Sequence, residues 1–235
     1  MTEHTHKQFD AEMEAIRTGV LAMGGLVETQ LSRAITLLEK EDATAVLDMV
    51  KADEQMINRM QIDMDQACSQ IIAKRQPAAI DLRMVLTVTK IVNDLERVGD
   101  ETKKIAKKAS QSAQDHRLTQ VRYFDVARAA ERAKEMLQLS LDAFARLDVE
   151  SATEVIDLDD EVDAAFSAIM RQLISYMMED PRTISAALEI VFIAKSIERI
   201  GDHAKNIAEA VVQVVKGKDV RHATAEQIRA EVAEE

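Results

Sequence analysis

The sequence predicts an all-α protein of two tandem three-helix bundles, with six long helices related by an internal pseudo-twofold repeat. Hydrophobic residues make up 47% of the 235 residues, but aromatic residues make up only 3% and Trp is absent. Gly and Pro number only six and two. Strands favour aromatic and β-branched residues, and tight turns favour Gly and Pro. This composition therefore favours long helices with few breaks.

The two prolines mark equivalent breaks in the two halves. Pro77 follows a long helical pattern, and so does Pro181. Pro ends the helix before it and fits the first turn of the next one. Softer breaks lie near Asp42, between residues 111 and 120, and near Asp148. We expect helices over residues 6–40, 43–75, 78–112, 119–147, 149–179 and 182–216.

An internal repeat supports this division. Residues 95–109 read LERVGDETKKIAKKA and residues 197–211 read IERIGDHAKNIAEAV, and seven of these 15 aligned positions are identical. The two segments lie at the same place in the third helix of each half. We predict an N-terminal bundle over 1–112, a C-terminal bundle over 113–216, and a polar tail over 217–235 with a short helix at 223–233.

Charge and cysteine content limit the classes of function. The formal net charge is −12, whereas non-specific nucleic-acid binding depends on clustered cations. We therefore expect no nucleic-acid partner. Cys68 is the only cysteine, so no intramolecular disulfide forms, and we expect it in the core. The polar N-terminus and the short apolar runs predict a cytoplasmic protein that reaches a membrane only through partner proteins.

The repeat carries a pair of carboxylates in each half. Glu96 and Asp100 are four residues apart, as are Glu198 and Asp202, so each pair lies on one helix face. A projection at about 100° per residue puts each pair at the border of the apolar stripe. Gly lies inside that stripe, where it costs about 1 kcal/mol relative to Ala. We infer that the helices approach something closely at the glycine.

A second acidic pair on a neighbouring helix completes a candidate site. Asp159 and Asp163 lie four apart in the fifth helix, and Glu54 and Asn58 are weaker candidates in the second. Carboxylate oxygens without Cys or His suit Mg²⁺, Mn²⁺, Ca²⁺ or iron. The alternative is an ordinary surface with salt bridges, in which Lys104 and Lys205 neutralise Asp100 and Asp202. His203 is expected at the exposed surface.

These motifs together resemble the PhoU family. The resemblance rests on LERVGD and IERIGD, on the AKRQPAAIDLR and YMMEDPRTI segments before them, and on two more segments. Those are AEMEAIRTGVLAMGGLVETQLSRAI near the start and LDAFARLD at 141–148. The resemblance covers residues 9–221. It implies two three-helix bundles and, in some members, multinuclear iron or other metal clusters at the acidic motifs.

The resemblance also implies a role. PhoU-like proteins are negative regulators of the phosphate (Pho) regulon, and link the transporter ATPase PstB to the sensor histidine kinase PhoR. No enzymatic activity is expected: the Glu-x-x-His pairs of a di-iron oxidase occur only once, at Glu3 and His6 in the N-terminal segment. Long amphipathic helices favour a homodimer. The alternative is a metal-binding helical scaffold without a phosphate role.

Overall fold

Every regular element is a helix in the parts of the chain that the structure describes, which are residues 2–39, 44–112, 121–220 and 227–229. The structure is a computed structural model, and it confirms the predicted all-α class. Six long helices follow one another, with a single 3₁₀ turn, η1 (Pro181–Thr183), before the last. They are α1 (Thr2–Glu39), α2 (Thr44–Arg75), α3 (Ala79–Ser112), α4 (Val121–Arg146), α5 (Val149–Glu179) and α6 (Ile184–Lys216).

Most helix ends fall within two residues of the expected ones, and two starts differ in an instructive way. α1 begins at Thr2, four residues before the expected start, because the polar first turn continues the helix. The last helix begins at Ile184 because Pro181 starts η1, in which Asp180 accepts a hydrogen bond from the Arg182 backbone at 3.0 Å. The tail helix expected at 223–233 falls mostly outside the described residues, of which 227–229 are helical.

The connection between α4 and α5 is two residues long because each of them has a special conformation. Leu147 adopts a left-handed backbone with φ of 53°, which ends α4. The Asp148 side chain then caps α5 by accepting hydrogen bonds from the backbone of Glu150 and Ser151 at 3.0 and 3.2 Å. Aspartate is a favoured N-cap because its carboxylate satisfies amide groups that have no partner in the helix. The short turn makes α4 and α5 antiparallel neighbours.

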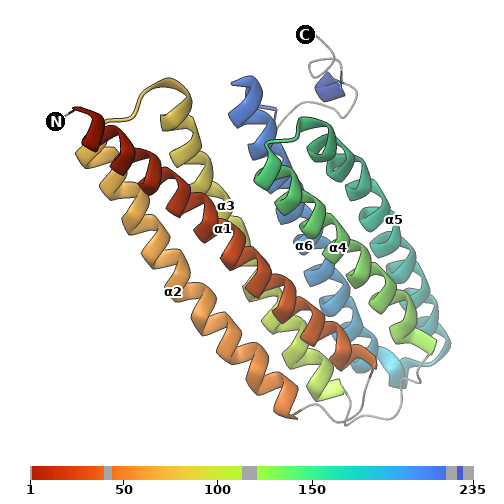
Figure 1. Cartoon of the computed structure of the whole chain (residues 1–235). Coiled ribbons are helices and arrows are strands. Elements are labelled where there is room, and N and C mark those ends of the chain that lie inside the picture. Colours follow the sequence, from red (N-terminus) through yellow and green to blue (C-terminus); the bar gives the residue numbers. More distant parts are fainter. Residues whose placement is uncertain (1, 40–43, 113–120, 221–226, 230–235) are drawn as a thin grey trace.

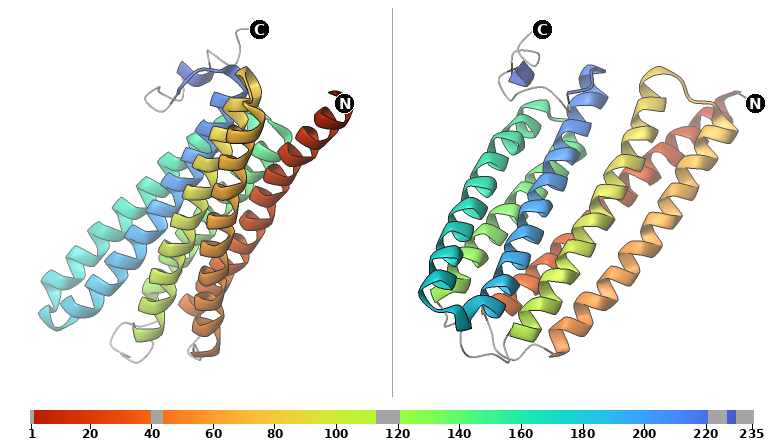
Figure 2. Two further views of the ribbon diagram at one scale, coloured as in Figure 1. Left: turned by 90° about the vertical axis from the view of Figure 1, so that its left-hand side faces the viewer. Right: turned by 180° about the vertical axis from the view of Figure 1, so that it is seen from behind.

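The helices form two three-helix bundles that lie side by side (Figure 1). α1, α2 and α3 pack on one another, and α4, α5 and α6 do the same. The bundles meet where α3 packs against α6 and α1 packs against α4. In the view from behind, α3 and α6 lie next to each other in the centre, with α2 and α5 outermost (Figure 2). The two motif-bearing helices therefore form the middle of the molecule.

Aliphatic side chains fill the interior of the protein. Val88 and Leu95 of α3, and Ile190 and Ile197 of α6, are almost fully buried. Cys68 is also buried, which confirms its predicted place in the core. No helix among the described residues has a stretch that is both long and apolar enough to cross a membrane.

Candidate metal centres

In the C-terminal bundle, the acidic pair of α6 faces the acidic pair of α5. Partial burial of the carboxylate, and then the negative charges of Asp159 and Glu198, raise the pKa of Asp163. Burial, and then Glu198, Asp159 and Asp163, raise the pKa of Asp202. Asp202 is exposed, so water moderates this increase. The four carboxylates therefore lie close enough to repel one another, and we call them the C-terminal acidic cluster.

Two lysines form ion pairs with carboxylates of this cluster. Lys205 Nζ lies 2.6 Å from Oδ2 of the buried Asp159, and Lys195 donates a hydrogen bond to Oε1 of Glu198. The other oxygen of Glu198, Oε2, is buried and has no hydrogen-bond partner. A buried carboxylate oxygen without a donor is costly, and it marks a position where a cation would be stabilised.

The N-terminal bundle repeats this arrangement with one amide in place of a carboxylate. Burial, then Asp100 and, more weakly, Glu54, raise the pKa of Glu96, although Arg97 opposes the effect. Glu54 is buried, and its Oε1 lies 2.9 Å from Lys103 Nζ and accepts a hydrogen bond from Asn58 at 3.0 Å. We call Glu54, Asn58, Glu96 and Asp100 the N-terminal acidic cluster. The structure thus brings together the expected pairs of α2 and α3.

Asn58 also offers an oxygen in the N-terminal acidic cluster. Its Oδ1 is buried and accepts no hydrogen bond. The described residues contain no group of three or more Asp, Glu, His or Cys side chains that is already arranged to hold a metal ion. In both clusters, lysine ammonium groups instead form salt bridges with carboxylates that could bind a metal ion. The oxygen donors suit a hard cation, which would have to replace these lysines.

The glycines between the carboxylates allow close helix packing. A Cβ on Gly99 would lie 3.2 Å from Cδ1 of Ile57 in α2. A Cβ on Gly201 would lie 3.3 Å from Cγ1 of Val162 in α5. The inferred close approach is thus made by the neighbouring helix of the same bundle. It holds the acidic pairs of adjacent helices near each other.

Two ion-pair expectations and one expectation of exposure are wrong. The partner of Lys104 lies on α3 itself, that of Lys205 lies on α5 of the same bundle, and that of His203 lies across the seam. Lys104 pairs with Glu101 at 2.9 Å, where the spacing favoured Asp100, and Lys205 pairs with Asp159. His203 is not an exposed surface residue: its ring Nδ1 lies 2.9 Å from Oδ1 of Asp94 in α3, and its side chain is 17% exposed.

Glu101 is a site residue that the sequence analysis missed. This carboxylate is buried and also binds Arg199 across the seam at 3.1 Å. Together with the contact between His203 and Asp94, it ties α3 to α6 beside the acidic clusters. The signal that could have found it is its place opposite His203 in the two copies of the repeat.

One carboxylate of each acidic cluster lines a shared hollow. A hollow of about 590 Å³ lies between α3 and α6, and Asp100 and Asp202 both line it. Arg97 and Arg199, which occupy equivalent places in the repeat, line it too. The fold and the site therefore define a class of duplicated helical-bundle proteins with carboxylate clusters on either side of their central seam.

Comparisons with known proteins identify the family within this class. The model of the PhoU domain matches twice, over residues 20–109 and 126–211. The phosphate-specific transport system accessory protein PhoU homolog of Pseudomonas putida is 43% identical over 232 residues, which cover 99% of this chain and 90% of that protein. The chain belongs to the PhoU family.

Solved structures share the fold. The crystal structure of PhoU from Pseudomonas aeruginosa matches with a TM-score of 0.85 and 43% identity, over 89% of this chain and all of that one. The phosphate transport system regulatory protein PhoU from Streptococcus pneumoniae matches with a TM-score of 0.82 and 25% identity, over 90% and 99% of the two chains. The two-bundle architecture extends over nearly the whole chain in both comparisons.

Proposed function

We propose that this protein regulates phosphate uptake, as a negative regulator of the phosphate-starvation regulon. The observation that supports this role is the family match in both halves, together with relatives named as accessory and regulatory proteins of phosphate transport. The protein acts as an adaptor between the transporter ATPase, PstB, and the sensor kinase, PhoR. A helical body in which no described helix could cross a membrane is compatible with that role.

The regulatory proposal is tested by deleting the gene and measuring a phosphate-starvation reporter in phosphate-replete medium. We expect expression to rise, because the repressing signal from the transporter no longer reaches the kinase. Co-purification with PstB and PhoR tests the adaptor step separately. Unchanged reporter expression favours the alternative of a metal-binding scaffold without a phosphate role.

The acidic clusters are proposed to bind a hard cation, such as iron, Mn²⁺, Mg²⁺ or Ca²⁺. The buried, unpartnered oxygens of Glu198 and Asn58 support this proposal, as does the mutual repulsion of the carboxylates. The C-terminal acidic cluster has four carboxylates and the N-terminal one has three. Since each added carboxylate strengthens the attraction for a divalent cation, we expect tighter binding in the C-terminal bundle.

Elemental analysis of protein purified without chelator tests the metal proposal. We expect stoichiometric metal, and loss of metal when Glu198→Ala is combined with Asp202→Ala. The matched control combines Asp142→Ala with Glu150→Ala, two exposed carboxylates outside both clusters. Metal-free wild-type protein whose thermal stability does not change with EDTA would contradict the proposal.

The homodimer is the remaining proposal. The described surface carries large exposed hydrophobic side chains on several helices, which is compatible with self-association. Sedimentation velocity at micromolar concentration distinguishes a dimer from a monomer. A monomer under these conditions would exclude a stable dimer.

A further inference from the structure

Exposed apolar side chains follow one face of the N-terminal half of α6. Ile184, Leu188 and Phe192 are spaced four residues apart and are 41%, 43% and 52% exposed. Residues with this spacing lie one above another along a helix. They form a continuous ridge, although a long aliphatic or aromatic side chain is stabilised by burial. The helix thus presents a face that no other described element covers.

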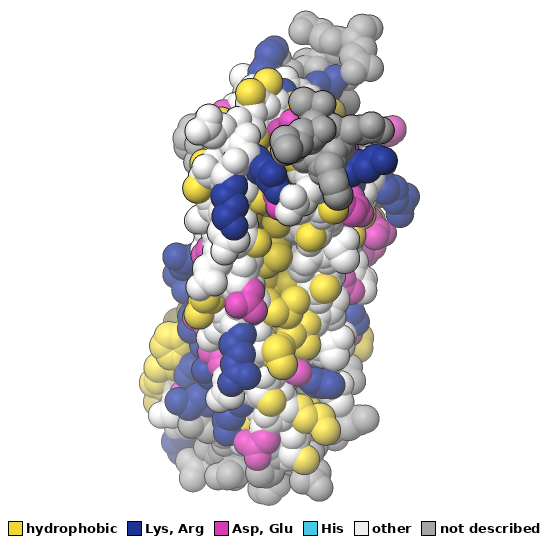
Figure 3. Space-filling view, turned by 60° about the vertical axis from the view of Figure 1, so that its left-hand side comes forward, with side chains coloured by type: hydrophobic (Ala, Val, Ile, Leu, Met, Phe, Trp, Pro, Cys, Tyr) yellow, Lys and Arg dark blue, Asp and Glu magenta, His cyan; other side chains and the backbone are white. Residues whose placement is uncertain are grey.

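The end of α5 that leads into α6 also carries exposed apolar side chains. Ile174 is 46% exposed and Met178 is 80% exposed, and both lie just before the turn that leads into α6. We call Ile174, Met178, Ile184, Leu188 and Phe192 the α5–α6 apolar patch. Apolar side chains also gather elsewhere, as in the band along the long axis in Figure 3, where charged side chains border it.

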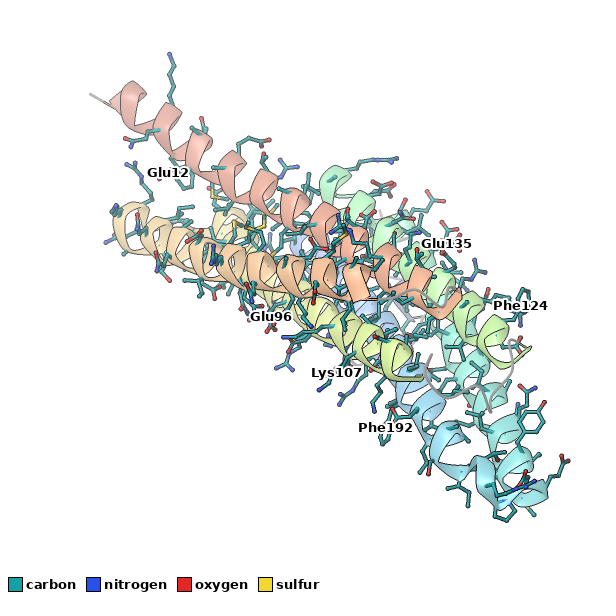
Figure 4. All side chains as sticks on the ribbon, turned by 90° about the horizontal axis from the view of Figure 1, so that it is seen from below. Glu12, Glu96, Lys107, Phe124, Glu135 and Phe192 are labelled. Carbon is teal, nitrogen blue, oxygen red and sulfur yellow. The ribbon has the colours of Figure 1, made fainter. Side chains whose placement is uncertain are left out.

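Lysines from α3 border the α5–α6 apolar patch. Lys104, Lys107 and Lys108 share one face of α3, because they lie three and four residues apart. Nζ of Lys108 lies 4.5 Å from the centroid of the Phe192 ring. Lys107 and Phe192 lie on the same side of the molecule (Figure 4). Lys104 and Lys108 each pair with a glutamate, Glu101 at 2.9 Å and Glu189 at 2.6 Å, and Lys107 is exposed. The three lysines therefore outnumber the two carboxylates that they contact, in a chain whose net charge is −12.

Most carboxylates near this border already have a basic partner. Glu189 lies 2.6 Å from Lys108, and Asp180 lies 2.9 Å from Arg182. Lys195 and Arg199, three and seven residues after Phe192, continue the same face of α6 and pair with Glu198 and Glu101. The surface therefore combines an apolar ridge with a cationic margin.

We propose that the α5–α6 apolar patch and the α3 lysines bind an amphipathic helix of a partner protein, with apolar residues on one face and carboxylates along its border. The apolar residues of that helix pack on Leu188 and Phe192, and its carboxylates face the lysine border, where Lys107 is exposed. An amphipathic helix that lays its apolar face on such a surface is a common mode of recognition. Charge complementarity then sets its orientation and its association rate.

Charge also argues against two other occupants of the patch, a second copy of this chain and a lipid bilayer. A second copy related by a twofold axis would bring the same lysine border against itself, because such an interface uses one patch twice. A bilayer rich in anionic lipid would be repelled by the strongly acidic remainder of the chain. An acidic helix meets neither obstacle.

A pair of synthetic helical peptides tests the proposal by fluorescence anisotropy. Both peptides carry the same Leu stripe, one bordered by Glu and the other by Lys. We expect the Glu peptide to bind at least about tenfold more tightly to the wild-type protein, with binding that weakens as salt rises. Its affinity should fall at least about tenfold in the Leu188→Ser, Phe192→Ser double variant.

A charge reversal and a matched control complete the design. Lys107→Glu should weaken the Glu peptide and strengthen the Lys peptide. Leu86→Ser alters the residue equivalent to Leu188 in the other half, which is 48% exposed, and should leave binding unchanged. All the altered side chains are exposed, so thermal melts should confirm that each variant folds.

Three results would overturn the proposal. One is equal binding of the two peptides, and another is undiminished binding in the double variant. The third is a different occupant: capture by phosphatidylglycerol vesicles without peptide binding, or a dimer that the double variant abolishes. The assay uses purified protein and needs no phosphate response, so its failure would leave the regulatory proposal standing.

Discussion

At the scale of single residues, spacing predicted which carboxylates gather, and packing decided which cations meet them. Residues four apart on a helix share a face whatever the fold, so the acidic pairs could be read from the sequence. The pairing of Lys205 with Asp159 joins residues 46 apart and depends on how α5 packs on α6. The contact between His203 and Asp94 depends on the seam between the bundles in the same way. Neither contact can be predicted from the spacing of residues along one helix.

The raised pKa of Asp163 predicts a stability gain when its charge is removed. Burial, Asp159 and Glu198 disfavour the ionised form, so Asp163→Asn should stabilise the protein in the presence of EDTA. The gain should not exceed about 1 kcal/mol, because Asp163 is exposed and solvent screens its charge. Urea unfolding at neutral pH measures it.

Asp142→Asn on the surface of α4 provides the control for Asp163→Asn and should have no comparable effect. With a bound divalent cation the order should reverse, since the wild-type protein keeps the ligand that the variant lacks. A destabilised Asp163→Asn variant in EDTA would show that repulsion is not the dominant effect in the cluster.

At the scale of elements, helix bounds were the most predictable feature. The fifth helix runs over 149–179 as expected, because Asp148 is a strong N-cap and Pro181 prevents continuation. The separate 3₁₀ turn before α6 was not expected, since the sequence does not show that the Asp180 side chain accepts a hydrogen bond from the backbone of the next turn. The repeat also suggested a close approach at its glycines, but only packing could show that Ile57 and Val162 make it.

Two adjacent glycines of α1 test how tightly the bundles pack. A Cβ on the buried Gly24 would lie 2.6 Å from Cδ1 of Leu141 in α4, whereas a Cβ on Gly25 would meet nothing within 4 Å. Gly25→Ala should raise the free energy of unfolding by about 1 kcal/mol, since Ala favours the helix. Gly24→Ala gains the same preference but overpacks the seam, so it should be less stable than Gly25→Ala by about 1–3 kcal/mol.

Chemical denaturation of the two glycine variants side by side measures this difference. The pair shares its helix, its neighbours in sequence and its change in side chain, so propensity cancels. Equal stability of the two variants would mean that α1 and α4 are packed less tightly than the structure shows.

At the scale of the whole molecule, duplication was evident in the sequence, but its spatial consequence was not. The repeat predicted two bundles and an acidic pair in each. Antiparallel packing of α3 on α6 then brings Asp100 and Asp202 to one hollow, which neither half forms alone. One face of the molecule therefore combines a carboxylate from each acidic cluster with the seam that joins the bundles.

The most direct test of the regulatory account is reporter expression from a phosphate-starvation promoter in phosphate-replete cells. The deletion strain should show raised expression, and a plasmid copy of the wild-type gene should return it to the original level. Complementation with the Glu198→Ala, Asp202→Ala variant then shows whether the C-terminal acidic cluster takes part in that role. A deletion strain whose reporter stays at the wild-type level would contradict the account.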